Sequence, residues 1–493
     1  MSRRVKRCYE WTSPLRMEWL VAVGLGKKQR KSGVMVVDQS RTAEMELRDE
    51  YQKLVHVMMN TPRVAIDNAM SPTATVVRVN SARKRGMLLE VVQVLADLNL
   101  RIQKGYISSD GRWFMDVFHV VDERGQKLLD PALVSLIERS LVGETSLSEA
   151  DGGADGSGLA GLTALELTGT DRPGLLSEVF AVLRDLECNI VEAKVWTHNA
   201  RIASLIFVKD IHTGSPIADG HRIHRIESRL GHVLRGDHDV RSAKTAVSSP
   251  TLIHSERRLH QLMFADRDYE RLSTTEDQAP SSSSQSKPSV SVQNWAERSY
   301  SVVSVQCRDR PKLLFDVACT LTDMDYVVFH GTLGVDADRA YQEFYIRHVD
   351  GGPISSEAER QRVIQCVQAA IERRASVGAR LSLKTPERRG LLAEATRIFR
   401  ENGLSIKSAE ITTKDGEAKS EFCVTDTGDH LPDRRSIHSV IEKIGEEHLT
   451  LSEHRAPWSY GERPPAAEAV GSFNLGNLVK RNLYYLGLVR SCS

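Results

Sequence analysis

A pattern that recurs four times along the chain limits the folds that this sequence can adopt. In each copy, an alternating apolar run is followed by a short turn and then by apolar residues at helical spacing. The second copy is the clearest, with the run Ala164–Thr168, the turn Asp171–Gly174 and one apolar helix face over Leu176–Leu186. A strand, a turn and an amphipathic helix in this order predict a helix that packs on one face of a sheet.

After this first helix, each copy continues with two β-rich runs and a second helix. In the second copy a last strand is expected near Val240–Val247. The interval from the last turn residue to the start of the second strand is 15 residues in every copy. The pairs that define it are Gly86 and Arg101, Gly174 and Asn189, Lys312 and Val327, and Gly390 and Ser405. The repeat predicts α+β units with the ferredoxin-like βαββαβ plan, in which antiparallel sheets carry helices on one face.

The repeat divides the 493 residues into four small units, two terminal segments and one linker. The predicted segments are a basic and disordered N-terminal extension over 1–44, units over 74–145, 162–247, 299–376 and 379–453, a linker over 248–298 and a C-terminal tail over 454–493. Within the linker, Ser255–Leu272 is expected to form a polar helix and Thr274–Ser291 to be disordered. Only one strand fits between the third and fourth units, so either the third unit lacks its last strand or Arg380–Lys384 serves both.

The balance of charge argues against a dedicated nucleic-acid binder. The chain has 66 Lys and Arg against 65 Asp and Glu, and the first 44 residues alone carry ten basic and four acidic residues. The basic patch Lys27–Lys31 fits nuclear import or organelle targeting, or belongs to a dispensable extension. Seven scattered cysteines predict reduced thiols, and no apolar run reaches the roughly 18 residues of a membrane span. We therefore expect a cytoplasmic or nuclear protein without a membrane span.

No motif in the sequence indicates catalysis. The GxGxxG match at Gly156–Gly161 precedes a strand, whereas the dinucleotide motif follows a strand and opens a helix. His221 and His224 lie on a polar helix face without the distant partners that a metal site needs. GxSxG, Walker and HExxH motifs do not occur. We expect no enzyme activity, no catalytic residues, no metal site and no cofactor.

The residues around the turns resemble the ACT domain, in which a strand and a D-R-P-G-L-L turn precede a helix and an N-I strand start. Longer blocks are similar to one group, the plant ACT-domain-repeat (ACR) proteins. These blocks are Leu88–Leu100, Tyr106–Phe118, Ala193–Asn199, Glu256–Tyr269, Tyr341–Gly351 and Asn482–Ser491. The resemblance covers residues 45–493 and implies four tandem ACT domains.

The resemblance implies a regulatory protein, because ACT domains typically bind amino acids or similar metabolites between paired domains. In ligand-binding ACT domains, the contacts come from the turn and from the start of the second strand. A glycine before the helix lets a ligand carboxylate approach free N–H groups, and a nearby acid or amide takes the ammonium. At these positions stand Asp171, Gly174 and Asn189 in the second unit and Glu387, Gly390 and Ser405 in the fourth.

The first and third units depart from this binding pattern. The first has Arg83 and Arg101 at the two polar positions, and the third has Lys312 in place of the glycine and Val327 in place of the Asn. We expect both units to be structural, although Arg83 would suit an anionic ligand. For any one turn, the alternative to binding is that it only caps a helix and ends a strand.

Two functions fit the sequence. The first is a non-catalytic sensor of amino acids or related small metabolites that signals to protein partners. The second is an interaction scaffold, in which the units and the tail over Asn474–Val489 bind proteins without a small ligand. A homodimer formed through ACT pairing is compatible with either function. The sequence leaves open whether the units pair within one chain or between chains, and it identifies no protein partner.

Overall fold

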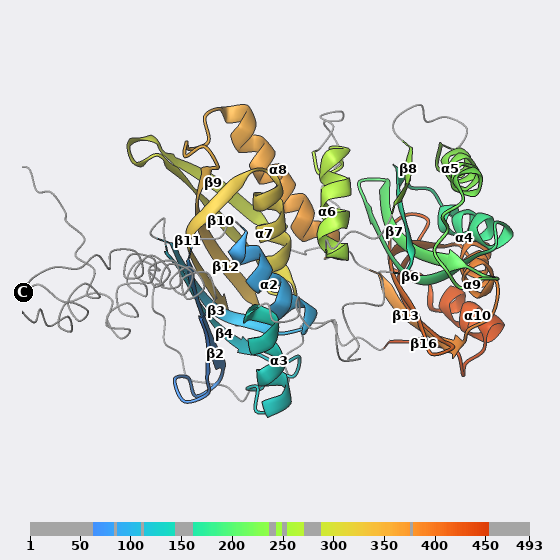
Figure 1. Cartoon of the computed structure of the whole chain (residues 1–493), viewed down its shortest axis with the longest axis horizontal. Helices are drawn as coiled ribbons and strands as arrows, with labels where there is room; N and C mark the ends of the chain where they lie inside the picture. The colour runs from blue at the N-terminus through green and yellow to red at the C-terminus, as the bar shows by residue number, and fades with distance from the viewer. Residues whose placement is uncertain are drawn as a thin grey trace, which may run out of the picture. The chain divides into compact units, whose positions relative to one another are not determined.

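The computed structural model describes residues 63–82, 86–109, 113–142, 161–235, 243–248, 254–270, 287–374 and 378–452. The predicted N-terminal extension, the Ser-rich part of the linker and the C-terminal tail lie outside these residues. The described residues form two eight-stranded antiparallel sheets, and each sheet is built from two units of the repeat (Figure 1). The predicted class of fold, antiparallel sheets that carry helices, is confirmed.

The first sheet combines the first and third units. Its spatial order is β1-β2-β4-β3-β11-β12-β10-β9. The strands are β1 (Arg63–Asp67), β2 (Thr75–Ala82), β3 (Arg101–Ser109), β4 (Trp113–Val121), β9 (Ser289–Trp295), β10 (Tyr300–Arg308), β11 (Tyr326–Asp336) and β12 (Arg339–His348). The helices of these two units are α2 (Met87–Asp97), α3 (Pro131–Val142), α7 (Leu313–Asp323) and α8 (Glu357–Arg374).

The second sheet combines the second and fourth units. Its spatial order is β16-β13-β15-β14-β6-β7-β5-β8. The strands are β5 (Thr163–Thr170), β6 (Cys188–His198), β7 (Arg201–Asp210), β8 (Lys244–Ser248), β13 (Ala379–Pro386), β14 (Leu404–Lys414), β15 (Glu417–Asp426) and β16 (Leu449–Leu451). The helices are α4 (Leu175–Asp185), α5 (Gly220–Arg235), α9 (Leu391–Glu401) and α10 (Arg434–Ile444).

The units pair within the chain through their second strands. β3 runs antiparallel to β11, with Gly105 opposite Leu333, and β6 runs antiparallel to β14, with Val195 opposite Ala409. These two junctions join the first unit to the third and the second unit to the fourth. Units that follow one another in the sequence are therefore not partners in a sheet, and the question that the sequence left open is answered.

The strand at the outer edge of each unit does not occupy the same place in the sequence of all four units. In the second and fourth units, β8 and β16 follow the second helix, as the βαββαβ plan predicts. In the first and third units, β1 and β9 occupy the equivalent edge but precede the first core strand. All four edge strands run antiparallel to the first core strand, so the same ladder forms whether the edge strand precedes that strand in a hairpin or follows the second helix.

The positions of the edge strands β1 and β9 in the sequence correct two predicted boundaries. β1 precedes the start predicted for the first unit at residue 74, and β9 lies in the segment assigned to the linker, including Ser289–Ser291. The alternating burial of Val290 and Val292 marks β9 as an edge strand with one face in the core. In the described residues no strand of the third unit follows α8, and β13 pairs only with strands of the fourth unit.

The linker helix is present as α6 (Ser255–Ala265), but it is not a purely polar helix. Its side chains at Glu256, Leu259, His260 and Met263 are at most 1% exposed. Near it, β7 is buried on both faces, because Ala203, Leu205 and Phe207 pack in the core that contains α6 while the alternate residues pack in the other core. A strand covered on both faces needs the continuous apolar run that β7 has.

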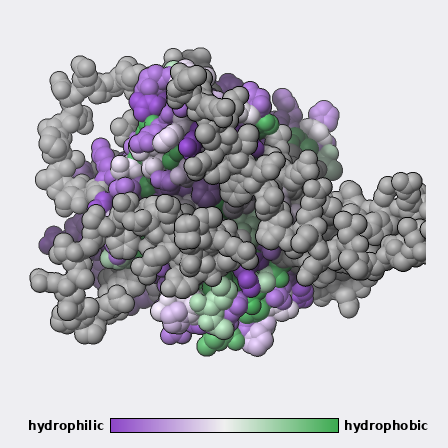
Figure 2. Space-filling model, turned by 90° about the vertical axis from the view of Figure 1, so that its left-hand side faces the viewer, coloured by the Kyte–Doolittle hydropathy of each residue, from purple (hydrophilic) through white to green (hydrophobic). Residues whose placement is uncertain are grey.

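The described surface carries few large apolar side chains. Figure 2 shows one face on which the described residues are mainly hydrophilic, with a smaller hydrophobic area at its lower edge. Leu129 and Leu431, which are 75% and 62% exposed, are the most exposed of the large apolar side chains among the described residues. No helix among these residues has the length and hydropathy needed to cross a membrane.

Candidate functional site

The first helix of every unit begins at a residue in the left-handed conformation. The angle φ is 88° at Gly86, 84° at Gly174, 59° at Lys312 and 80° at Gly390. None of these four residues caps its helix with a side chain, so the first N–H groups of the helix have no side-chain partner from this position. Left-handed φ favours glycine, which explains three of the four turns.

In the second sheet, the turn of the second unit faces the second strand of the fourth unit. A cavity of about 300 Å³ lies between them, and Asp171, Gly174, Arg400 and Ser405 contribute to its walls. The other lining residues come from the same turn, the start of α4, α9 and β14, and they are Arg172, Leu175, Leu176, Ser177, Thr396, Leu404 and Ile406. We call it the Asp171 cavity.

A second cavity repeats this arrangement with the units exchanged. The turn of the fourth unit faces the second strand of the second unit across about 520 Å³ of empty space. Glu387, Gly390, Asn189 and Arg184 contribute to its walls. We call it the Glu387 cavity.

The structure brings all six predicted site residues to these two cavities, but it groups them differently from the sequence prediction. The prediction placed Asp171 with Asn189, whereas the structure places Asp171 with Ser405. The turn is held at the far end of its own second strand, because Asp171 N donates to Ala200 O at 2.8 Å. In an antiparallel junction, the far end of one strand lies beside the start of its partner. The same geometry holds Glu387, whose N donates to Gly416 O at 2.7 Å.

Asp171 is the titratable group that the Asp171 cavity perturbs most clearly. Burial raises the pKa of its carboxyl group to about 6, Lys407 lowers this pKa and Asp429 raises it. Lys407 itself forms an ion pair with Asp429, with 2.5 Å between Nζ and Oδ1. At neutral pH the Asp171 carboxylate is therefore mostly charged and can accept a hydrogen bond from an ammonium group.

The first sheet has an equivalent cavity at the turn of the third unit, but the chain fills its polar positions. The cavity of about 520 Å³ is lined by Arg101, Asp309 and Lys312, among other residues. Arg101 Nη2 lies 3.0 Å from Asp309 Oδ2, and the two side chains are 20% and 14% exposed. A cation from the first unit thus already neutralises the turn acid of the third. The other polar turn position of this pair, at Arg83, lies outside the described residues.

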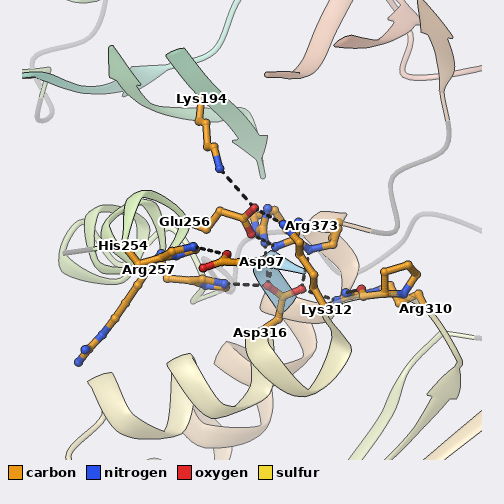
Figure 3. A network of polar contacts seen from close by, with 12 residues as sticks. Asp97, Lys194, His254, Glu256, Arg257, Arg310, Lys312, Asp316 and Arg373 are labelled. Atoms are coloured by element: carbon orange, nitrogen blue, oxygen red, sulfur yellow. Dashed lines mark hydrogen bonds and ion pairs between the residues drawn. The ribbon is translucent and has the colours of Figure 1, made fainter. Parts of the chain in front are cut away.

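Lys312 stands where the other units have glycine, and it is part of a buried ionic network (Figure 3). Its Nζ lies 2.6 Å from Glu256 Oε1 on α6, and Glu256 also contacts Arg374 at 2.7 Å and Lys194 at 3.6 Å. Burial raises the pKa of Glu256, but Arg374, Lys312 and Lys194 together hold it well below the usual range. Figure 3 shows Lys194 extending from its strand toward Glu256.

Asp316 on α7 is the second acidic centre of the network. It is fully buried and contacts Arg310 at 2.8 Å, Arg374 at 2.9 Å and Arg373 at 3.2 Å. His260 Nε2 lies 2.9 Å from the same carboxylate. Burial alone raises the pKa of Asp316, but the three arginines hold it well below the usual range.

Sequence analysis missed this network, although the repeat contains a signal for it. Asp316 lies four residues after the left-handed turn residue, and Glu178 and Glu394 lie at the same interval in their units. Each of these acids pairs with the arginine of its own turn. In the second unit that pair is half-buried and in the fourth it is exposed, whereas in the third it is buried under α6 and α8. The pattern predicts the pair, but only the packing of the linker helix shows that it is buried.

The histidines set aside in the sequence do not form a metal site in the described part of the chain. His221 and His224 lie exposed on α5. No group of three or more His, Cys, Asp or Glu side chains suited to a metal ion is found among the described residues. Most of the GxGxxG match lies outside them.

Three segments of the chain match known domain models. The ACR family N-terminal ACT domain matches residues 70–148, the ACT domain matches 163–219, and the ACR9-like, ACT-like domain matches 289–380. These segments correspond to the first three units.

The chain is also similar over most of its length to curated plant proteins. It is 56% identical to the ACT domain-containing protein ACR8 of Arabidopsis thaliana, over 90% of this chain and 98% of that protein. It is 47% identical to the ACT domain-containing protein ACR4 of the same plant, over 91% of this chain and 99% of that protein. A third relative, ACR6, is 50% identical over 82% of this chain and 92% of its own length.

Proposed function

Because the chain belongs to the ACR family of ACT domain-containing proteins, we propose that it is a non-catalytic regulatory protein that senses amino acids or related small metabolites and signals to partner proteins. We further propose that the fourth unit is an ACT domain like the first three, so that the chain carries four. Its strand order β16-β13-β15-β14 matches the order β8-β5-β7-β6 of the second unit.

The observation that carries this proposal is the crossed composition of the two cavities in the second sheet. Each cavity combines an acid and a glycine from one turn with a polar residue from the partner's second strand. An α-amino acid offers an ammonium to the acid and further polar atoms to the Ser405 hydroxyl or the Asn189 amide. A ligand held by both units would stabilise their junction, which gives binding a structural consequence.

A thermal-shift panel of the twenty amino acids on the full chain tests the proposal. A ligand at 100 times its dissociation constant stabilises the native state by about 2.7 kcal/mol. For a pair of units of this size, that corresponds to a rise of roughly 5–10 °C in the unfolding midpoint. We expect at least one amino acid to give such a shift, and the double variant Asp171→Ala with Glu387→Ala to lose it.

Glu442→Ala is the matched control, because Glu442 is an exposed carboxylate on α10 of the same pair of units. This variant should keep the full shift. If no amino acid moves the midpoint of the unaltered chain, sensing is wrong and the scaffold function becomes the better explanation. If the shift survives the double variant, the two cavities are not the binding sites.

A further inference from the structure

An arginine from the partner unit lies across the turn glycine in each cavity of the second sheet. A Cβ atom built on Gly174 would come within 2.3 Å of Arg400 Cδ, and one built on Gly390 within 2.9 Å of Arg184 Cδ. Arg184 and Arg400 occupy the same repeat position, ten residues after the turn glycines Gly174 and Gly390. The glycines are therefore needed for two reasons, a left-handed φ and the close approach of an arginine stem.

Neither arginine neutralises the acid of its cavity. Among the described residues, no ion pair joins Arg400 to Asp171 or Arg184 to Glu387. Arg184 pairs instead with its exposed neighbour Asp185 at 2.9 Å, a contact of the kind that contributes little to stability. Each cavity thus presents an acid from one unit and an arginine from the other, beside the arginines of the acid's own turn.

In the first sheet, by contrast, the turn acid and the cation of the partner unit form an ion pair. At the position equivalent to Arg184 and Arg400, the first unit has Ala96, which lines the cavity of the third-unit turn. There the cation is supplied by Arg101 instead, and it pairs directly with Asp309. Among the described residues, the arginine ten positions after the glycine therefore occurs where the turn acid has no arginine ion-pair partner.

We propose that Arg400 and Arg184 bind the α-carboxylate of the ligand in the Asp171 and Glu387 cavities, while the turn acid binds its α-ammonium. This inference rests on the proposed function and deepens it. The ligand class is then a free α-amino acid with both charges, held across the junction between two units. A guanidinium matches a carboxylate in geometry and charge, and neighbouring backbone N–H groups at the helix start add to the same attraction.

The space between α4 and α9 adds a preference for acidic side chains. This groove, of about 860 Å³, touches the glycine turn of the fourth unit at Gly390, and its charged lining consists of four arginines and two glutamates. They are Arg184, Arg389, Arg397, Arg400, Glu178 and Glu394. The excess of positive charge favours an amino acid whose side chain is acidic or neutral and disfavours lysine and arginine.

The direct test compares each of the twenty L-amino acids with its own α-carboxamide on the full chain, by thermal shift and by titration calorimetry. The carboxamide keeps the ammonium and the side chain but lacks the carboxylate. We expect it to bind at least tenfold more weakly. We expect Arg400→Met with Arg184→Met, which keeps apolar stems and removes both charges, to weaken the amino acid at least tenfold and to leave the carboxamide unchanged. Arg435→Met on α10 is the matched control and should bind as the unaltered chain does.

The glycines provide a second, independent variant. Gly174→Ala and Gly86→Ala both place a side chain at a strongly positive φ, but only at Gly174 does the new Cβ meet an arginine. We expect Gly174→Ala to weaken binding in the Asp171 cavity and Gly86→Ala to leave it unchanged. Equal binding of amino acids and carboxamides, or full binding by the double arginine variant, would overturn the inference while leaving amino-acid sensing intact. Absence of any amino-acid binding would overturn the proposed function and, with it, this inference.

Discussion

The two pairs of units share one strand order but use the same repeat positions differently. In the pair of the second and fourth units, the turns keep glycine, and within the described part of the chain the turn acids face cavities without forming an ion pair with an arginine. In the pair of the first and third units, Arg101 neutralises Asp309, and Lys312 replaces the glycine at the third turn. One pair is built to leave charges available, and the other has paired them within the chain.

The comparison shows how copies of one repeat can take different roles, with one pair of units stabilising the structure and the other left to bind a ligand. Lys312 adopts a left-handed φ that costs a side-chain-bearing residue roughly 1–2 kcal/mol. Its ion pair with the buried Glu256 offsets part of this cost and fixes α6 against the turn. Lys194 of the second unit reaches the same glutamate, so the network also links the two pairs. We infer that the first pair and the linker helix hold the second pair in place.

The largest expected effect is the loss of stability when the buried acid of the third unit, Asp316, is removed. Asp316→Ala removes the carboxylate that Arg310, Arg373 and Arg374 share; Arg310 and Arg373 are at most 5% exposed, while Arg374 keeps its contact with Glu256. Breaking a buried ionic group by removing one partner costs about 3–5 kcal/mol, because the remaining charges are left uncompensated. We expect the urea midpoint of the full chain to fall accordingly.

Glu394→Ala is the matched control, since it removes the acid at the same repeat position in the fourth unit. The ion pair of Glu394 with Arg388 is largely exposed, at 41% and 58% for the two side chains. Exposed pairs of this kind contribute about 0–1 kcal/mol. If the two variants lose equal stability, burial does not distinguish the third turn from the fourth.

The second prediction concerns pH and the acid of the Asp171 cavity. Because the pKa of Asp171 is raised to about 6 in the folded state, the native state binds more protons than the unfolded state between about pH 4 and 6. Stability therefore falls as pH rises through this window, by up to about 2–3 kcal/mol for a shift of roughly two units. Asp171→Asn should flatten this decline, which urea titrations at pH 4, 5, 6 and 7 would measure.

The same carboxylate sets the pH dependence of binding. A ligand ammonium pairs with the ionised form of Asp171, so affinity in that cavity should increase as pH rises from 5 to 7 and then level off. Asp309→Asn serves for comparison, because Arg101 opposes the effect of burial on the pKa of Asp309. An unchanged pH profile in Asp171→Asn would show that another group controls this window.

The sequence allowed the repeat and the class of fold to be predicted, because both depend on local pattern and spacing. The same pattern pointed to the six residues that line the two cavities, and their role in binding stays a prediction. The sequence did not allow the partner of each unit to be predicted, since the junctions of β3 with β11 and of β6 with β14 join residues about 200 positions apart. The crossed grouping of Asp171 with Ser405 follows from that pairing and was missed for the same reason. The edge strands β1 and β9 were missed because a strand that precedes the first core strand and one that follows the second helix complete the same antiparallel ladder.

The smallest expected effect is the coupling between Arg101 and Asp309, and it bears most directly on the difference between the two pairs. The ion pair is partly buried, so we expect a coupling energy of about 1–2 kcal/mol, more than an exposed pair and less than the Asp316 network. A double-mutant cycle with Arg101→Ala, Asp309→Ala and the double variant measures it from urea midpoints. A coupling near zero would mean that Arg101 does not neutralise the turn acid in solution, and the first pair would then present the same available acid as the second.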